Sequence, residues 1–209
     1  SIRYITIDEG PSRSGISDFW IDALHIYKKD RSRDYSVNIA KNLDQEGDPQ
    51  PIASASSDER SDPWAPLRGT YRFAGSATPR WIPDVSADPD DKVWYGVDFG
   101  VERVVNRVDV YFYHNPSGTP SQDTEWKPDT FTVEYWTGKH WKRVNQASAG
   151  EIKPNRNTVT FQTVHTSKLR VVLTPRRTEA GTAAPSVYGF AAFNTENLAG
   201  NAFGEEEPA

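Results

Sequence analysis

Two tryptophans, Trp64 and Trp126, lie in polar stretches that contain prolines and charged residues and show no strand-like alternation. Sugar rings stack their apolar C–H faces on aromatic planes, while polar side chains bind the hydroxyl groups. Loop tryptophans of this kind therefore predict a stacking site for a ligand such as carbohydrate. The alternative for each ring is that it plugs one end of the fold.

The polar segment 114–127 surrounds Trp126 and joins two strand-like runs. It is longer than a hairpin needs, and long loops often carry function. Its side chains offer hydrogen-bond donors and acceptors, and the irregular segment 63–93 adds others. The predicted ligand-binding residues are Trp126, Trp64, His114, Asn115, Gln122, Asp123, Glu125, Tyr71 and Arg72. For any single residue, a surface loop position without a ligand remains the alternative.

Catalytic patterns are missing from the sequence. The four histidines lack metal-ligand spacing, and there is no G-x-S-x-G elbow or phosphate-binding glycine loop. Acidic pairs such as Asp123 and Glu125 arise by chance in an acidic chain, and glycoside hydrolysis needs two carboxylates across a cleft. We therefore expect no catalytic residue and no metal ligand in this chain.

Three strand-like runs between residues 94 and 144 must position these loops. Alternation in 104–114 predicts one face with Val105, Arg107, Asp109, Tyr111 and Tyr113, and an opposite face with Val108, Val110 and Phe112. The runs 131–136 and 141–144 are separated by four residues that include a glycine, which predicts a hairpin.

Further strand-like runs at 157–164, 169–176 and 187–194 have no helical periodicity between them. The fold class predicted is all-β, an antiparallel β-sandwich or jelly roll. The predicted organisation is N-terminal strands at 1–29, a sandwich at 30–198 and an acidic flexible tail at 199–209. The strands at 1–29 are either a remnant of, or link to, a preceding β-domain, or extra strands of the same sandwich.

The composition excludes several functions. The net charge of −5 disfavours nucleic acid and anionic membranes as partners, since both need a basic surface. The absence of cysteine excludes disulfides, thiolate metal sites and cysteine nucleophiles. The absence of methionine, including an initiator, favours a mature or excised fragment of a secreted protein.

The order of the segments resembles the galactose-binding-like β-sandwich of discoidin and coagulation-factor C-terminal domains, over roughly residues 36–194. The segments that carry the resemblance are ASASSD at 53–58, RW at 80–81, WYGVDFG at 94–100, VVNRVDVYFYH at 104–114, FTVEYWTGKHWKRV at 131–144 and NTVTFQTVHTSKLRVVLTPR at 157–176. It is closest to versions appended to bacterial glycoside hydrolases, which act as carbohydrate-binding modules. The resemblance implies a non-catalytic carbohydrate-binding module of a secreted polysaccharide-acting enzyme, with the parent's catalytic domain as a partner. It also assigns Trp81, Trp94 and Trp141 to core packing.

One departure from the family concerns its structural calcium ion. Arg68 stands where the family has an aspartate, and Ala191 and Ala192 stand where its last strand has a glutamate. Calcium prefers several carboxylate or carbonyl oxygens, so we expect no cofactor, with the calcium site absent or displaced. The alternative position for a displaced metal is the acidic run Asp84, Asp88, Asp90 and Asp91.

Three other functions remain open. The chain could be a structural or interaction domain that supports a catalytic domain without binding sugar. It could be one fragment of a cleaved glycoside hydrolase. The membrane-binding discoidin type is disfavoured, because the loops are acidic where basic residues beside apolar spikes are needed.

Overall fold

A computed structural model describes residues 38–42, 50–57, 61–69, 71, 74, 77–86, 91–113, 125–145, 151–153, 155–179 and 181–195, with only the backbone at 125 and 126. All of them belong to one unit, residues 35–209. The predicted strands at 1–29 and the tail at 199–209 lie outside the described residues. The predicted domain boundaries therefore stay predictions.

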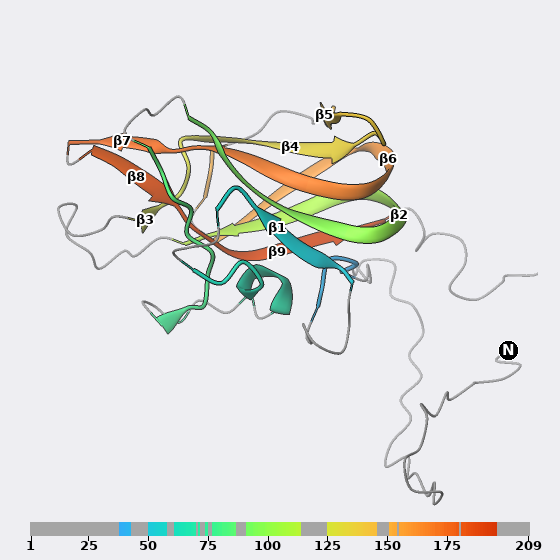
Figure 1. The fold of residues 1–209 in the computed structure, drawn as a ribbon, viewed down its shortest axis with the longest axis horizontal. Coiled ribbons are helices and arrows are strands. Elements are labelled where there is room, and N and C mark those ends of the chain that lie inside the picture. The colour runs from blue at the N-terminus through green and yellow to red at the C-terminus, as the bar shows by residue number, and fades with distance from the viewer. Residues whose placement is uncertain are drawn as a thin grey trace, which may run out of the picture. The chain divides into compact units, whose positions relative to one another are not determined.

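The described chain is built almost entirely of strands (Figure 1). The strands are β1 Ile52–Ala55, β2 Val93–Phe112, β3 Glu125–Trp126, β4 Thr130–Trp136, β5 Trp141–Arg143, β6 Asn155–Thr174, β7 Arg176–Thr178, β8 Gly181–Pro185 and β9 Val187–Phe193. A single 3-10 turn, η1 (Ala65–Arg68), is the helical element of this described part. The predicted all-β antiparallel fold is confirmed. Within the same residues, no helix is long and apolar enough to cross a membrane.

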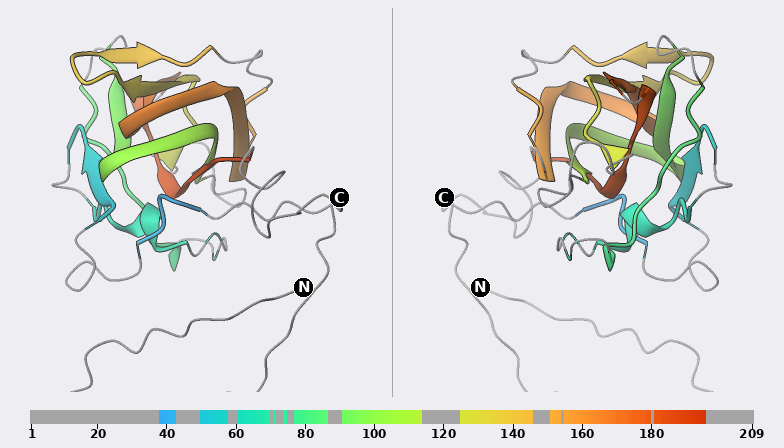
Figure 2. Two further views of the ribbon diagram at one scale, coloured as in Figure 1. Left: turned by 90° about the vertical axis from the view of Figure 1, so that its right-hand side faces the viewer. Right: turned by 90° about the vertical axis from the view of Figure 1, so that its left-hand side faces the viewer.

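Two strands of 20 residues, β2 and β6, contribute to both layers of the sandwich. Their first layer has the order β1-β2-β6-β4-β5, and β9 pairs with the second half of β2 in the other layer. The β2–β6 ladder shifts register between Asp98 and Arg103 and again between Val105 and Arg107, and such irregularities bend strands. Figure 2 shows β2 and β6 curving around the interior. The sequence predicted two strands where β6 is one bent strand.

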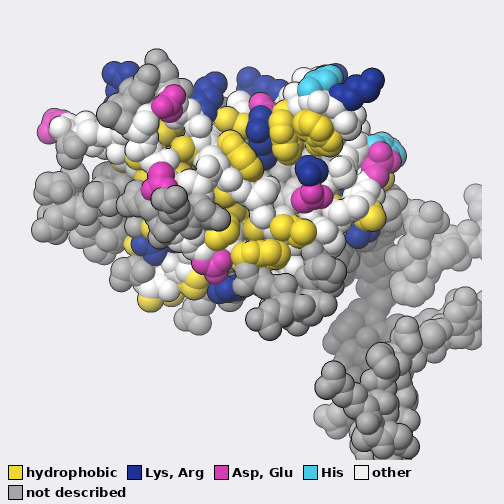
Figure 3. Space-filling model, viewed as in Figure 1, with side chains coloured by type: hydrophobic (Ala, Val, Ile, Leu, Met, Phe, Trp, Pro, Cys, Tyr) yellow, Lys and Arg dark blue, Asp and Glu magenta, His cyan; other side chains and the backbone are white. Residues whose placement is uncertain are grey.

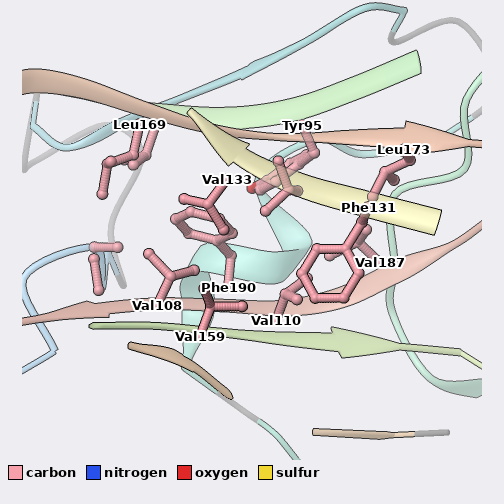
Figure 4. Packing of buried hydrophobic residues seen from close by; sticks show 14 of the residues in the cluster. Tyr95, Val108, Val110, Phe131, Val133, Val159, Leu169, Leu173, Val187 and Phe190 are labelled. Atoms are coloured by element: carbon pink, nitrogen blue, oxygen red, sulfur yellow. The ribbon is translucent and has the colours of Figure 1, made fainter. Parts of the chain in front are cut away.

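The core lies between the two layers (Figure 4). The first layer contributes residues such as Tyr95, Val133 and Leu169, and the second contributes Val110 and Phe190, all with 0% of their surface exposed. The ring of Tyr95 lies 5.8 Å from that of Phe190, which joins the layers. The predicted facing of the side chains holds along β4 and along β2 from Arg107 to Phe112, although Asp109, on the outward face, is buried and paired with Arg107 and Arg156.

Two local predictions have different outcomes. The hairpin of β4 and β5 is confirmed, with Gly138 at a φ of 89° in its turn. The predicted orientation of Val105 is wrong, because this side chain is fully buried in the core with Val108. The register shifts between Val105 and Arg107, where β2 advances two residues and β6 advances four, and such an irregularity interrupts the regular alternation of facing.

Candidate functional site

One end of the sandwich gathers the strand ends that flank the predicted binding loops. Leu173 of β6 pairs with both Val93 and Phe131, so the start of β2, the start of β4 and the end of β6 lie together. The ring of Phe112, at the end of β2, lies 5.2 Å from that of Phe131. We call this the loop end, defined by Val93, Phe112, Phe131 and Leu173.

A pocket of about 840 Å³ opens at the loop end. The 127–132 segment, which leads into β4, forms much of its wall. The described residues lining it are Lys92, Lys127, Pro128, Asp129, Thr130, Phe131, Thr132, Arg143, Glu151, Ile152 and Arg176. This volume is in the range of small-molecule sites.

Hydrogen bonds fix the wall of this loop-end pocket. The Lys127 ammonium donates to the carbonyl oxygen of Ile152 at 2.6 Å, which ties the 127–132 segment to the 151–153 segment. The Asp129 amide donates to the Thr174 carbonyl oxygen at 2.9 Å, and the hydroxyls of Thr130 and Thr174 are 2.8 Å apart. The wall is therefore fixed by hydrogen bonds to Thr174 of β6 as well as by contacts between loop residues.

Charge in the loop-end pocket is predominantly positive. Four cationic side chains, Lys92, Lys127, Arg143 and Arg176, line it together with two carboxylates, Asp129 and Glu151. Its described lining contains no histidine, serine or tyrosine. The arrangement offers donors, acceptors and one ring, which are groups that bind and orient hydroxylated ligands.

Sequence analysis did not select these lining residues. Arg176 is the last residue of a predicted strand, and Lys92 and Asp129 lie two residues before predicted strands. The ends of alternate strands of a sandwich meet at the same end. That juxtaposition was the available signal, and neither the loop tryptophans nor the loop length indicates it. Glu151 had no signal, since its place depends on the bond between Lys127 and Ile152.

Tyr71, one of the predicted ligand-binding residues, packs on the outer face of the second layer. Its ring stacks on Tyr111 with 4.5 Å between centroids and 4° between planes. Its hydroxyl donates to the Phe190 carbonyl oxygen at 3.3 Å and accepts from the Asn38 amide at 2.5 Å. Burial, with smaller contributions from Tyr111 and Asp109, raises the pKa of Tyr71 well above its ordinary value of 10.0. The phenol is therefore a neutral structural donor, and Tyr71 does not line the loop-end pocket.

Trp64 is half-buried and packs against the hydrophobic core. It is the N-cap residue of η1 and its side chain makes no capping hydrogen bond, while its backbone amide donates to the Asp62 carboxylate at 2.9 Å. This ring contributes to packing beside η1, and it does not line the loop-end pocket. Its assignment to ligand binding stays a prediction.

The other predicted ligand-binding residues fall largely outside the described residues. These are Arg72, His114, Asn115, Gln122 and Asp123. Glu125 and Trp126 form β3, which pairs in parallel with Ala184 and Pro185 of β8, and nothing is described of their side chains. The backbone of Trp126 directly precedes Lys127, so the predicted loop leads into the pocket wall.

The three tryptophans assigned to the core divide into two groups. Trp81 is fully buried, and its indole N–H donates to the Ser57 carbonyl oxygen at 2.7 Å, so its assignment is confirmed. The assignment of Trp94 and Trp141 is wrong, because both are half-buried on the outward side of the first layer. Their neighbours Val93 and Tyr95, on alternate positions from Trp94, take the inward places.

The region expected to have lost calcium contains two cationic side chains. The Arg68 guanidinium lies 2.8 Å from the Asp62 carboxylate, and Gly69 lies against the side chain of Lys41. The backbone of β9 is buried at Ala191 and Ala192, with no acid there. Among the described side chains, no group of three or more histidines and acids could hold a metal. Asp84 and Asp91 are described, whereas Asp88 and Asp90 are not, so the displaced site stays untested.

Comparison with known proteins agrees with this architecture. Residues 73–171 match the model of the NedA-like, galactose-binding domain family, which confirms the resemblance seen in the sequence. The fold is the galactose-binding-like β-sandwich. No curated protein matches the chain.

Several solved structures share the fold. One comes from the β-galactosidase BgaA of Streptococcus pneumoniae, at 21% identity and a TM-score of 0.59, covering 76% of this chain and 98% of that chain. Chitosan-binding module 2 of a chitosanase/glucanase from Paenibacillus sp. IK-5, in complex with chitotriose, has 17% identity and a TM-score of 0.51, covering 75% and 100%. The family 32 module of C. perfringens NanJ, in complex with galactose, has 16% identity and a TM-score of 0.50, covering 69% and 93%.

Proposed function

We propose that this chain is a non-catalytic carbohydrate-binding module and that it binds a glycan at the loop-end pocket. The observation that carries the proposal is a polar pocket of about 840 Å³ at the end of a galactose-binding-like sandwich. The half-buried Ile152 supplies an apolar surface beside the mostly buried Phe131, and lysine, arginine and carboxylate groups supply partners for sugar hydroxyls. Complexes of similar modules with galactose and chitotriose support this ligand class.

The charge of the loop-end pocket narrows the ligand. Four cationic side chains against two carboxylates repel a glycan that carries amino groups. We therefore propose a neutral glycan, or one with carboxylates, in contrast to the chitosan bound by the Paenibacillus modules. The pocket contacts only one or two sugar units, so a dissociation constant on the order of 0.1–1 mM is expected, about 4–5.5 kcal/mol.

We further propose that the module belongs to a secreted polysaccharide-acting enzyme, which it holds near its substrate. The catalytic domain of that parent enzyme would then be its protein partner. Calcium is not part of the proposal, since Arg68 and Lys41 occupy the region in which the family's ion is bound. The alternative of one fragment from a cleaved hydrolase would be revealed by a larger mass under native than under denaturing conditions.

A structural domain without sugar affinity is the second candidate. The packing of Trp64 against the core favours it, because this ring was one of two expected to stack on a ligand. Both candidates predict the same fold. They differ only in whether the loop-end pocket takes up glycan.

Incubation of the 209-residue chain with a panel of plant and bacterial polysaccharides separates the candidates. Titration calorimetry should show heat with at least one neutral or acidic glycan, while release of reducing ends stays at the blank level. The variant Arg143→Ala should weaken that binding, and Arg103→Ala, which removes an exposed arginine at the bend of β2, should not. Heat with no glycan would favour the structural candidate, and reducing ends from this chain alone would contradict a non-catalytic role.

A further inference from the structure

Three tryptophans gather on the outward side of the first layer. Trp94, Trp136 and Trp141 are all half-buried, and Arg170 and Glu134 lie among them. We call this group the tryptophan face. Figure 3, which views this side, shows hydrophobic side chains over β4, β5 and β6 with a basic side chain between them.

Strand register places these residues on one face. Gly96, Arg170, Glu134 and Arg143 form one row across four strands, because each pairs with the next. Trp94 lies two residues before Gly96, and Trp136 pairs with Trp141 two positions along from Glu134 and Arg143. Residues two apart on a strand share a side of the sheet, so all of them project outward.

Arg170 lies between the rings and is fixed there. Its guanidinium carbon is 4.3 Å from the ring centroid of Trp141 and 5.6 Å from that of Trp94. Its Nη2 lies 2.7 Å from the Glu134 carboxylate. A side chain at Gly96 would meet the Arg170 Cβ at 2.9 Å, so the glycine makes room for this arginine. The Trp136 and Trp141 rings meet edge to face, 5.5 Å apart.

The charges of the tryptophan face are paired. Arg170 is neutralised by Glu134, and the adjacent Lys168 lies 2.7 Å from the Asp98 carboxylate. The fixed aromatic rings complement the apolar C–H faces of sugar units, and the paired polar groups between the rings complement the hydroxyls. The surface therefore suits a neutral polysaccharide chain. A charged partner would gain nothing from it.

The tryptophan face continues into the loop-end pocket. Thr132 lines the pocket and pairs with Val172, which pairs with Trp94. Arg143 also lines the pocket and belongs to the row of Arg170 and Glu134. A ligand that leaves the pocket on this side passes over the rings.

We propose that the tryptophan face binds the continuation of a neutral polysaccharide whose first unit occupies the loop-end pocket. The module then recognises several consecutive sugar units of one chain. This inference rests on the proposed function of the pocket. It adds a second contact surface on the sheet, made of residues other than the predicted loop tryptophans.

The test measures affinity against chain length. Galacto-, gluco- and xylo-oligosaccharides of one to six units are titrated into the 209-residue chain and into Trp94→Ala, Trp141→Ala and their Phe counterparts. The expected result is a gain of roughly tenfold, about 1.4 kcal/mol, from the single sugar to the longest oligomer of the series that binds. The Ala variants should lose that gain and keep the affinity for the single sugar, while the Phe variants retain part of it. Ile52→Ala, an exposed apolar residue on the same side but outside the face, should behave as the wild type.

Each other outcome overturns the inference. Binding of the single sugar with no gain in length, or a gain that survives both Ala substitutions, would refute the tryptophan face and leave the pocket intact. A loss of the gain in Ile52→Ala would indicate general apolar adhesion. Absence of binding at every length would refute the tryptophan face, and the pocket would be refuted with it if acidic glycans also give no heat. Thermal melts of each variant show whether a lost gain comes from unfolding, and the Phe variants carry the test where an Ala variant is unfolded.

Discussion

At the residue scale, the alternation of residues predicts the burial of Trp94 correctly, whereas the family resemblance does not. Trp94 follows Val93 and precedes Tyr95, both of which are buried, so the pattern alone places its ring outward. The resemblance had assigned it to the core. Trp81, in contrast, lies in an irregular segment without alternation of apolar and polar residues. Its burial follows from an isolated antiparallel β-bridge to Val187. That contact spans the chain and has no local signal.

The tryptophans should therefore differ in their effect on stability. Trp81→Ala should lower the free energy of unfolding by about 3–5 kcal/mol, because a fully buried ring leaves a cavity. Trp141→Ala should cost clearly less, since its ring is half in solvent on the sheet surface. Urea unfolding curves of both variants give the comparison. Equal penalties would mean that the sheet surface around Trp141 is buried in solution.

Asp98 should make stability depend on acid. Burial alone would raise its pKa, but the hydrogen bonds from Lys168 and from the Gly100 amide lower the pKa below its ordinary value of 3.8. A lowered pKa stabilises the fold above the ordinary value, and this contribution is lost as the pH falls through the lowered pKa. The melting temperatures of the wild type and Asp98→Asn should thus converge below pH 3.8. Glu102→Gln, at a 69% exposed side chain, is the control and should show no such convergence; a constant gap for Asp98→Asn would contradict the account.

At the scale of elements, the sequence predicted the strands but not how two of them bend. The runs in β2, β4 and β6 were readable from alternation, β9 from a short apolar run, and the β4–β5 turn from its glycine. The bends at 98–107 were not, because a register shift is set by pairing with β6. The short strands β3, β7 and β8 were also missed, since their residues show no alternation and pair only with each other.

The residues at and beside η1 predict that the fold does not need calcium. Arg68 is paired with Asp62, and Lys41 lies over Gly69, so two cations occupy this region. A calcium ion there would be repelled. EDTA should leave the melting temperature unchanged, as measured by differential scanning calorimetry. A fall of several degrees that calcium restores would show that the acids at 84–91 hold a metal.

At the scale of the whole molecule, the tyrosines should limit stability in alkali. Burial is the largest cause that raises the pKa of Tyr71, Tyr95, Tyr111 and Tyr188. Their contribution is complete below the ordinary value of 10.0 and is lost as the pH rises towards the raised values. At least these four of the nine tyrosines should stay protonated above pH 10 until the fold opens. Phenolate absorbance measures this, with the chain in denaturant as the control; nine phenols ionising together near pH 10 in the folded chain would refute it.

The site was predictable only in its general place. The long loop after β2 pointed to this end of the sandwich, and the resemblance pointed to carbohydrate. The lining residues Lys92, Asp129 and Arg176 come from three separated segments, and only the closed sandwich brings them together. The cationic character of the pocket runs against the net charge of −5, so composition could not have indicated it.

Mapping of backbone amide shifts by NMR tests the central claim, glycan binding at the loop-end pocket, most directly. The oligosaccharide that gives heat in calorimetry is added stepwise to the isotope-labelled 209-residue chain. The predicted result is a set of saturable shifts at Lys92, at residues 127–132, at Arg143 and at Glu151, with the second layer unmoved. Shifts confined to the second layer, or no shift at any residue, would contradict the account.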